Sequence, residues 1–400
     1  MRGDCRLRRA HVALAAVFVV FGALGGNWDA RLPAVRQRLS LDSGELGIVI
    51  FAVLLTATAI LPLAGWLAAR LGSRGPSALG LLCAGAGITA AAFVPSYASL
   101  LPAACVIGAG WGIVDVATNA HGVAIEEALG RRVLSGLHSA WSFGLLAGSG
   151  IAAGAAAASI GLRVQFPVVA AAAALAIAVA TPFLLPATGA ALDVAHFALP
   201  RGPLALPAVL MFCGFFVEAA TVSWAAVFLT GPVGTSSALA AGGVVSFSLA
   251  MGAVRLVGDR LLERWGIGGL CLRSGALSCV GLAVALGTRS PAPALIGFAC
   301  VGAGSAPIIP ALFRVGGTVP GVASGAGIAA VATAGYAGGV VNGPAIGFLA
   351  RGVGLSGALG LVGAAALVIA LLGPRLGLET SPAKPATPGR KPAGRGRRPG

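Results

Sequence analysis

Long apolar stretches alternate with short polar, glycine-rich or proline-containing breaks along almost the whole chain. A helix needs about 20 apolar residues to cross a membrane, and each stretch is close to that length. We expect six such helices first, at residues 12–33, 44–68, 76–94, 98–125, 137–159 and 165–186. Six more follow at residues 204–230, 236–256, 267–287, 292–313, 324–349 and 355–373. The first stretch runs on into Trp28 and Pro33 without a small-residue cleavage site, so we interpret it as a permanent helix.

The longest polar interruption divides the predicted helices into two sets of six. We therefore expect an N-terminal half over residues 1–186, a cytoplasmic linker over 187–203, a C-terminal half over 204–373 and a disordered basic tail over 374–400. Residues 108–110 (Gly-Ala-Gly) recur as residues 302–304, an offset of about 194 residues that several other positions share. Parallel six-helix repeats are typical of transporters that bind solute between their halves.

Composition supports a membrane protein. Hydrophobic residues make up 57% of the chain and charged residues 10%, whereas soluble domains carry roughly 25% charged residues. The 62 glycines suit close packing of helices in lipid. The seven cysteines show no metal-binding spacing, and we expect neither a metal site nor a cofactor.

The net charge of +15 is distributed unevenly between the two predicted sides of the membrane. Six of the 27 basic residues fall on the side opposite the N-terminus, namely Arg31, Arg36, Arg38, Arg163, Arg289 and Arg351. Cytoplasmic loops are enriched in Lys and Arg, so we expect an inner-membrane protein with both termini in the cytoplasm. The basic tail is expected to lie against lipid headgroups, and we expect no nucleic-acid partner.

The loop after the second predicted helix reads GWLAARLGSR over residues 65–74. It resembles the loop pattern G-x-L-a-D-r-x-G-r-k of the major facilitator superfamily, although Ala69 stands where that family usually has Asp. The resemblance implies that this loop takes part in gating. The matching positions are Gly65, Arg70, Gly72 and Arg74.

A second copy of this loop, over residues 255–261, keeps an acidic residue. We expect Asp259 to pair with Arg260 or with a facing helix end, as a conformational latch. The alternative is that these arginines serve only to orient the chain in the membrane.

Further segments narrow the resemblance. Residues 28–33, 45–47, 112–120, 137–139 and 342–348 are similar to the MosC-like branch, a bacterial group related to sugar permeases such as the fucose–proton symporters. The resemblance covers residues 12–372. It implies an all-α membrane protein with the major facilitator fold, twelve transmembrane helices in two six-helix halves, and it implies no particular substrate.

Ionisable residues inside spanning helices are costly and usually mark a pathway or an ion pair. Asp115 and Asn119 are four residues apart and share one helical face, which we expect to point into a central cavity. Glu218 lies near the middle of the seventh helix, and His138 begins the fifth. We predict proton coupling through Asp115, Glu218 and His138. A structural role for each remains the alternative.

Trp28 and Arg31 lie on one face of the first predicted helix, and Trp224 echoes Trp28 in the seventh. We expect Trp28, Arg31, Asn119 and Trp224 to contact a hydroxylated or anionic solute. Arg31 needs a partner, for which Glu218 is the first candidate and Asp29 the second. The alternative is an interfacial aromatic belt with a snorkelling arginine.

These features favour a monomeric secondary transporter that moves a sugar-like or other polar solute, with proton coupling, by alternating access. Two alternatives stay open: an efflux antiporter for a drug or metabolite, and a non-transporting membrane sensor with the same fold. We expect no enzymatic activity, because the four histidines, His11, His121, His138 and His196, are too scattered to form a catalytic or metal cluster.

Overall fold

The computed structural model describes residues 2–131, 133–185 and 200–379, and within these ranges the elements are helices, with no strand. The N-terminal bundle consists of α1 (Arg2–Ala30), α2 (Leu32–Leu39), α3 (Ser43–Ala59), α4 (Leu61–Leu71), α5 (Arg74–Ala91), α6 (Tyr97–Leu129), α7 (Leu134–Ala157) and α8 (Leu162–Ala180). The C-terminal bundle consists of α9 (Ala205–Thr230), α10 (Ser237–Arg255), α11 (Gly258–Gly287), α12 (Pro291–Ser305), α13 (Ile308–Gly316), α14 (Ser324–Ala358) and α15 (Gly360–Glu379). Short 3-10 helices cover Thr181–Phe183 and Gly202–Leu204.

Each of the twelve predicted apolar stretches coincides with a helix or with a pair of consecutive helices. By length and composition, eight of the described helices can cross a membrane, or up to ten if each bent pair counts as one span. The bent pairs are α3 with α4, at 42°, and α14 with α15, at 66°. The helices at the core of the fold are therefore those that local hydrophobicity predicts.

Several helix ends differ from the ends of the predicted apolar stretches, including two in the C-terminal bundle. The last helix continues to Glu379, beyond the predicted end at residue 373, and α11 begins at Gly258 rather than at residue 267. A kink explains the second difference: Gly266 has φ 63° and ψ 172°, so residues 258–265 form a short helical segment at an angle to the span. Most of the predicted linker, 187–199, and of the predicted tail, 380–400, lies outside the described residues.

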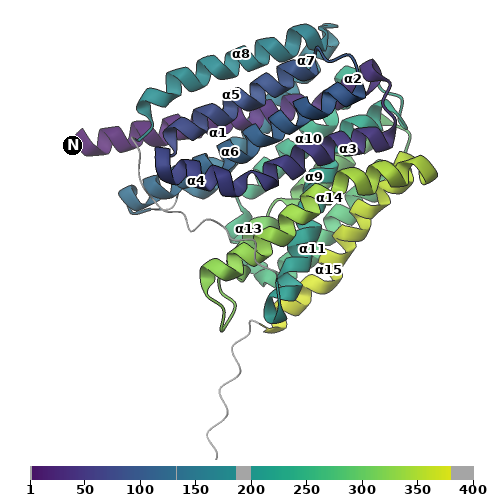
Figure 1. The fold of residues 1–400 in the computed structure, drawn as a ribbon. Coiled ribbons are helices and arrows are strands. Elements are labelled where there is room, and N and C mark those ends of the chain that lie inside the picture. The colour runs from purple at the N-terminus through teal and green to yellow at the C-terminus, as the bar shows by residue number, and fades with distance from the viewer. Residues whose placement is uncertain (1, 132, 186–199, 380–400) are drawn as a thin grey trace, which may run out of the picture.

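The two bundles lie side by side, and they meet along two pairs of helices (Figure 1). One contact joins α3 to α14, and the other joins α7 to α10. We call the end of the bundles where α1 ends and α3 begins the distal end. The opposite end, where α1 starts, is the proximal end.

Each bundle contains a tight glycine contact between two of its own helices, at equivalent positions of the repeat. A Cβ at Gly108 in α6 would collide with the Val53 carbonyl of α3, and one at Gly302 in α12 would collide with the Phe247 carbonyl of α10. Glycine is needed at both positions because only a residue without a side chain lets the two helix backbones approach so closely. The sequence repeat at these positions therefore reflects a repeated packing arrangement.

The backbone turns repeat with the same offset that separates Gly108 from Gly302. Ser40 and Gly234 both have positive φ, of 51° and 76°, and Gly72 and Gly266 have φ of 70° and 63°. Gly72 and Gly266 also share ψ near the extended region, at 167° and 172°. With this offset, the structural counterpart of the loop over residues 65–74 covers residues 259–268, which is later in the chain than the predicted copy at residues 255–261.

Candidate functional site

A cavity of about 280 Å³ lies between the two bundles. Helices α1, α3, α4, α6 and α7 line it from one side, and α9 and α14 line it from the other. Aromatic side chains form much of the wall: Phe21, Trp28, Trp111, Trp141, Phe215 and Tyr336. Three carboxylates, Asp29, Asp115 and Glu218, also line it, and no basic side chain is among its described lining residues. We call this space the central cavity.

Asp115 lies on the cavity face of α6 and is joined to a polar chain. The side-chain amide of Asn119 donates to the Asp115 carboxylate at 3.1 Å and to the Asp115 carbonyl at 2.9 Å. The Asn119 Oδ1 atom lies 3.1 Å from Nε2 of His138 in α7. Because an amide oxygen can only accept, His138 is the donor through Nε2. Two of the predicted proton-coupling residues are therefore connected through Asn119.

His138 opens onto a second cavity, of about 410 Å³, at the proximal end. This proximal cavity is lined by residues of α7, α10, α11, α13 and the turn before α13, with Arg255, Asp259 and Arg314 among its charged groups. The His138 side chain is exposed there. The chain from Asp115 through Asn119 to His138 thus runs from the central cavity to the proximal cavity.

Glu218 of α9 forms an ion pair with Arg255, at the end of α10. The Nη2 atom of Arg255 lies 3.3 Å and 3.1 Å from the two carboxylate oxygens, and both side chains are mostly buried. The Nη1 atom of the same guanidinium donates to the Ser142 hydroxyl of α7 at 2.8 Å. Arg255 therefore neutralises Glu218 and also ties the C-terminal bundle to the N-terminal one.

The predicted pairing of Arg31 with Glu218 or Asp29 is wrong. Arg31 follows α1 directly, is 6% exposed, and donates through Nη2 to the carbonyl of Ile160 at 3.0 Å. Its Nε and Nη1 atoms have no hydrogen-bond partner among the described residues. Arg31 does not line the central cavity. The rotation of the helix explains this outcome, because residues two apart point about 200° away from each other, so that Asp29 faces the cavity and Arg31 faces the turn before α8.

The two tryptophans of the predicted binding site have different places. Trp28 lines the central cavity and its ring packs against Phe166, with centroids 6.1 Å apart. Trp224 is fully buried in the core and is not among the residues that line the cavity. Asn119 does not line it either, and acts instead through its bonds to Asp115 and His138.

The sequence-based site missed several lining residues. The sequence predicts Asp29 only as a partner for Arg31, and neither Trp111 nor Trp141 is among the predicted site residues. The spacing of Trp111, Asp115 and Asn119, four residues apart along α6, places all three on one face, and this signal was available in the sequence. No comparable spacing indicates Trp141.

The predicted gating loops lie at the proximal end. In the first, Arg70 stacks over the ring of Trp66 at 5.3 Å, and Gly72 ends α4 with its positive φ. In the second, Asp259 pairs with Arg314, in the last turn of α13, at 2.9 Å. Of the two predicted partners for Asp259, the facing helix end is the one present, and both side chains of this pair are exposed.

His121, buried in α6, links the first of these loops to the end of α8. The Leu185 N–H donates to Nε2 of His121 at 3.1 Å, so Nε2 is an acceptor. The proton must then lie on Nδ1, which donates to the Ser73 hydroxyl at 2.8 Å. A neutral imidazole with one defined tautomer thus joins three segments of the N-terminal bundle.

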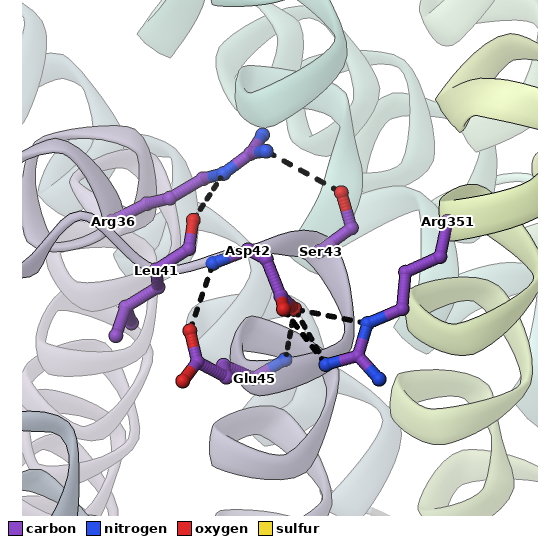
Figure 2. A network of polar contacts seen from close by, with 6 residues as sticks. All are labelled: Arg36, Leu41, Asp42, Ser43, Glu45 and Arg351. Atoms are coloured by element: carbon purple, nitrogen blue, oxygen red, sulfur yellow. Dashed lines mark hydrogen bonds and ion pairs between the residues drawn. The ribbon is translucent and has the colours of Figure 1, made fainter.

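A polar network closes the distal end between the bundles (Figure 2). Asp42 caps α3: it accepts from the Glu45 N–H at 2.9 Å, and the Glu45 side chain accepts from the Asp42 N–H at 2.9 Å. Arg351 of α14 donates to both oxygens of Asp42 at 2.8 Å. The backbone N–H of Glu45, together with the Arg351 guanidinium, holds the pKa of the Asp42 carboxyl below its usual range. We call the Asp42–Arg351 pair the distal latch.

Glycines allow α3 and α14, which carry the two sides of the distal latch, to pack closely against each other. A Cβ at Gly47 of α3 would collide with the Gly343 carbonyl of α14, and one at Gly347 would collide with the Ser43 carbonyl. Gly150 and Gly154 of α7 lie 193 residues before Gly343 and Gly347 in the repeat, and both have open space where a Cβ would lie. In this conformation the repeated glycines of α14 therefore make close helix contacts, whereas those of α7 do not.

Comparison with known proteins agrees with this architecture. The model of the Major Facilitator Superfamily matches residues 12–320. An uncharacterized MFS-type transporter of Yersinia pestis is 31% identical over 361 residues, covering 90% of this chain and 94% of the relative. The membrane protein MosC of Rhizobium meliloti is 28% identical over 359 residues, covering 90% of this chain and 88% of MosC.

Among solved structures, that of the nucleoside transporter NupG (D323A mutant) superposes with a TM-score of 0.70 at 15% identity, covering 92% of this chain and 99% of NupG. At this identity the likeness concerns the fold alone. The resemblance to MosC is confirmed, and the relation to fucose permeases stays a prediction. The family match, the relatives and the all-helical architecture together show that this chain is a multi-pass membrane protein of the major facilitator superfamily, a family of transporters and not of enzymes.

Proposed function

We propose that this protein is a proton-coupled secondary transporter that carries a small polar solute through the central cavity by alternating access. It works as a monomer in the cytoplasmic membrane, with both termini in the cytoplasm, so that the proximal end faces the cytoplasm. Membership of a transporter family supports the general activity, and the arrangement of the polar groups supports proton coupling.

The observation that carries the proposal is the polar chain from Asp115 to His138. Asp115 faces the central cavity, and His138 faces the proximal cavity, with one amide between them. A carboxylate that binds and releases protons needs a route to water, and histidine is the side chain best suited to exchange protons near neutral pH. Asp115 is thus the proposed proton site, and His138 its route to the cytoplasm.

Two polar contacts between the bundles support alternating access. The distal latch lies at one end, and the bond from Arg255 to Ser142 lies nearer the other. A rocking motion of the bundles would break one contact while keeping the other. Glu218 pairs with Arg255, so a change in the proximal contact would also change the ion pairing of Glu218 in the central cavity.

Uptake and efflux use the same site in this proposal, so the antiporter alternative differs only in the direction in which the solute moves relative to the protons. A sensor without transport is less well supported, because a sensor has no need for a polar chain between two cavities.

Coupling is tested in liposomes with the purified protein. A pH gradient is imposed, and internal pH is followed with a trapped dye while sugars, polyols and amines are added one at a time. A solute that moves protons identifies both the substrate and the direction. If none of these solutes causes proton movement, the proposal is contradicted.

Asp115→Asn should abolish gradient-driven accumulation of that solute and keep its exchange across the membrane without a gradient, because only the proton site is lost. Glu127→Gln is the matched control, since Glu127 is an exposed acid at the end of the same helix. Unchanged accumulation by Asp115→Asn would remove Asp115 as the proton site.

A further inference from the structure

The ionisable groups of the central cavity give it a negative character. Its described lining has the carboxylates of Asp29, Asp115 and Glu218 and no Lys, Arg or His. The expectation of an anionic solute depended on Arg31, whose side chain points to the Ile160 carbonyl instead. Glu218 is neutralised by Arg255, so an anion in this cavity would meet the carboxylates of Asp29 and Asp115, which have no cation beside them.

The three carboxylates differ in what they bind within the protein. Glu218 is paired with Arg255, and Asp115 accepts a hydrogen bond from Asn119. Asp29 is 8% exposed and has no hydrogen bond or ion pair with any described residue. A buried carboxylate without a partner is costly, and it is retained where a ligand or a proton satisfies it. Asp29 is therefore the carboxylate available to a solute.

The aromatic wall suits the same kind of ligand. Trp28 directly precedes Asp29 in α1, and Trp111 and Trp141 enter the cavity from α6 and α7. Aromatic faces attract organic cations, most strongly when the site excludes water. The indole N–H of Trp111 is buried with no acceptor among the described residues, so it is free to donate to a hydroxyl of the solute.

We propose that the solute of the central cavity is a small organic cation, a protonated amine, whose ammonium group pairs with Asp29 while its ring or hydroxyl-bearing frame lies among the tryptophans. This inference rests on the proposed transport function and adds the substrate class to it. The cavity volume of about 280 Å³ lies just below the range of pockets for drug-sized ligands, so the amine is small. Asp29 holds the solute, and Asp115 remains available for the proton.

The test uses three probes of nearly equal shape and different charge: benzylamine, benzyl alcohol and benzoate. Each is titrated calorimetrically into the full-length protein in lipid nanodiscs at neutral pH. Benzylamine should bind at least tenfold more tightly than benzyl alcohol, and benzoate should not bind. Equal or tighter binding of benzyl alcohol or benzoate, or no binding of benzylamine, would overturn the proposal.

Asp29→Asn should lower the affinity for benzylamine at least tenfold and leave that for benzyl alcohol unchanged, and Asp29→Glu, which keeps the charge, should restore part of it. Glu127→Gln is again the control. If Asp29→Asn does not fold, Asp29→Glu and the charge series on the unmodified protein still decide. Tight benzylamine binding without proton movement would contradict the proposed coupling and uphold the cation site. Asp115-dependent transport of a neutral sugar, without transport of amines, would uphold the coupling and contradict the cation site.

Discussion

At the scale of single residues, hydrogen-bond geometry defines the protonation of groups that sequence cannot assign. His121 accepts from one backbone N–H and must therefore donate to Ser73, which fixes it as a neutral imidazole. The bond to Ser73 is buried and the bond to Leu185 is partly buried, so losing either one leaves its partner group without a replacement hydrogen bond. A buried hydrogen-bonding group that is left without a partner lowers the stability of the fold by roughly 1–3 kcal/mol.

We expect His121→Phe to lower the free energy of unfolding by about 2 kcal/mol, because the Leu185 N–H and the Ser73 hydroxyl both lose their partner. Thermal melting of the purified protein in detergent measures the change. Ser73→Ala removes one bond only and should have about half the effect. Equal melting temperatures for His121→Phe and the unmodified protein would show that these bonds add nothing to stability.

At the scale of helices, glycine positions decide where the bundles touch. Gly47, Gly343 and Gly347 let α3 and α14 approach at backbone distance, and the contact reaches Ser43, which follows Asp42 of the distal latch. The corresponding glycines of α7 contact nothing at their Cβ positions. Identical residues at equivalent repeat positions therefore have unequal roles in this conformation.

Gly347→Ala should push α14 away from Ser43 and shift the protein toward conformations that are open at the distal end. Double electron–electron resonance between spin labels on the distal ends of α3 and α14 should show a longer distance in this variant than in the unmodified protein. Gly154→Ala is the matched control, and it should leave the distance unchanged while slightly stabilising α7, since Ala favours helix over Gly by roughly 0.5–1 kcal/mol. The same distance change in both variants would contradict a specific role for the α3–α14 contact.

At the scale of the whole molecule, the distal latch makes closure depend on pH. The folded pKa of Asp42 is lowered, so the latch is complete above the ordinary aspartate pKa of about 3.9 and is lost as pH falls through the lower folded value. The pair is half-exposed, and its contribution is that of a surface ion pair, which is also weakened by salt.

The spin-label distance across the distal end should therefore stay constant from pH 8 to pH 5 and lengthen in stronger acid. Asp42→Asn should remove this acid response, and Asp42→Arg combined with Arg351→Asp should restore closure at neutral pH. A distance that changes between pH 8 and pH 5 would show that another group controls the distal end.

The helices, the family and the two-fold repeat are predictable from the amino-acid sequence. Local hydrophobicity predicts where a helix crosses a membrane, and the glycine echo of residues 108–110 and 302–304 marks backbone contacts that recur in the structure. Asp115 and Asn119 could be placed on a shared face because their spacing needs nothing beyond helical geometry.

The contacts between polar groups, in contrast, depend on how the helices pack in three dimensions. Helices that are apolar on every side do not reveal which face turns inward, so the rotation of α1 that brings Asp29 to the cavity and Arg31 to Ile160 could not be read from the chain. The reach of Arg255 back from the end of α10 to Glu218 depends likewise on the packing of three helices. The physical reason is that helix formation is governed by neighbouring residues, whereas ion pairs and cavities are governed by helix rotation and packing, which many distant residues fix together.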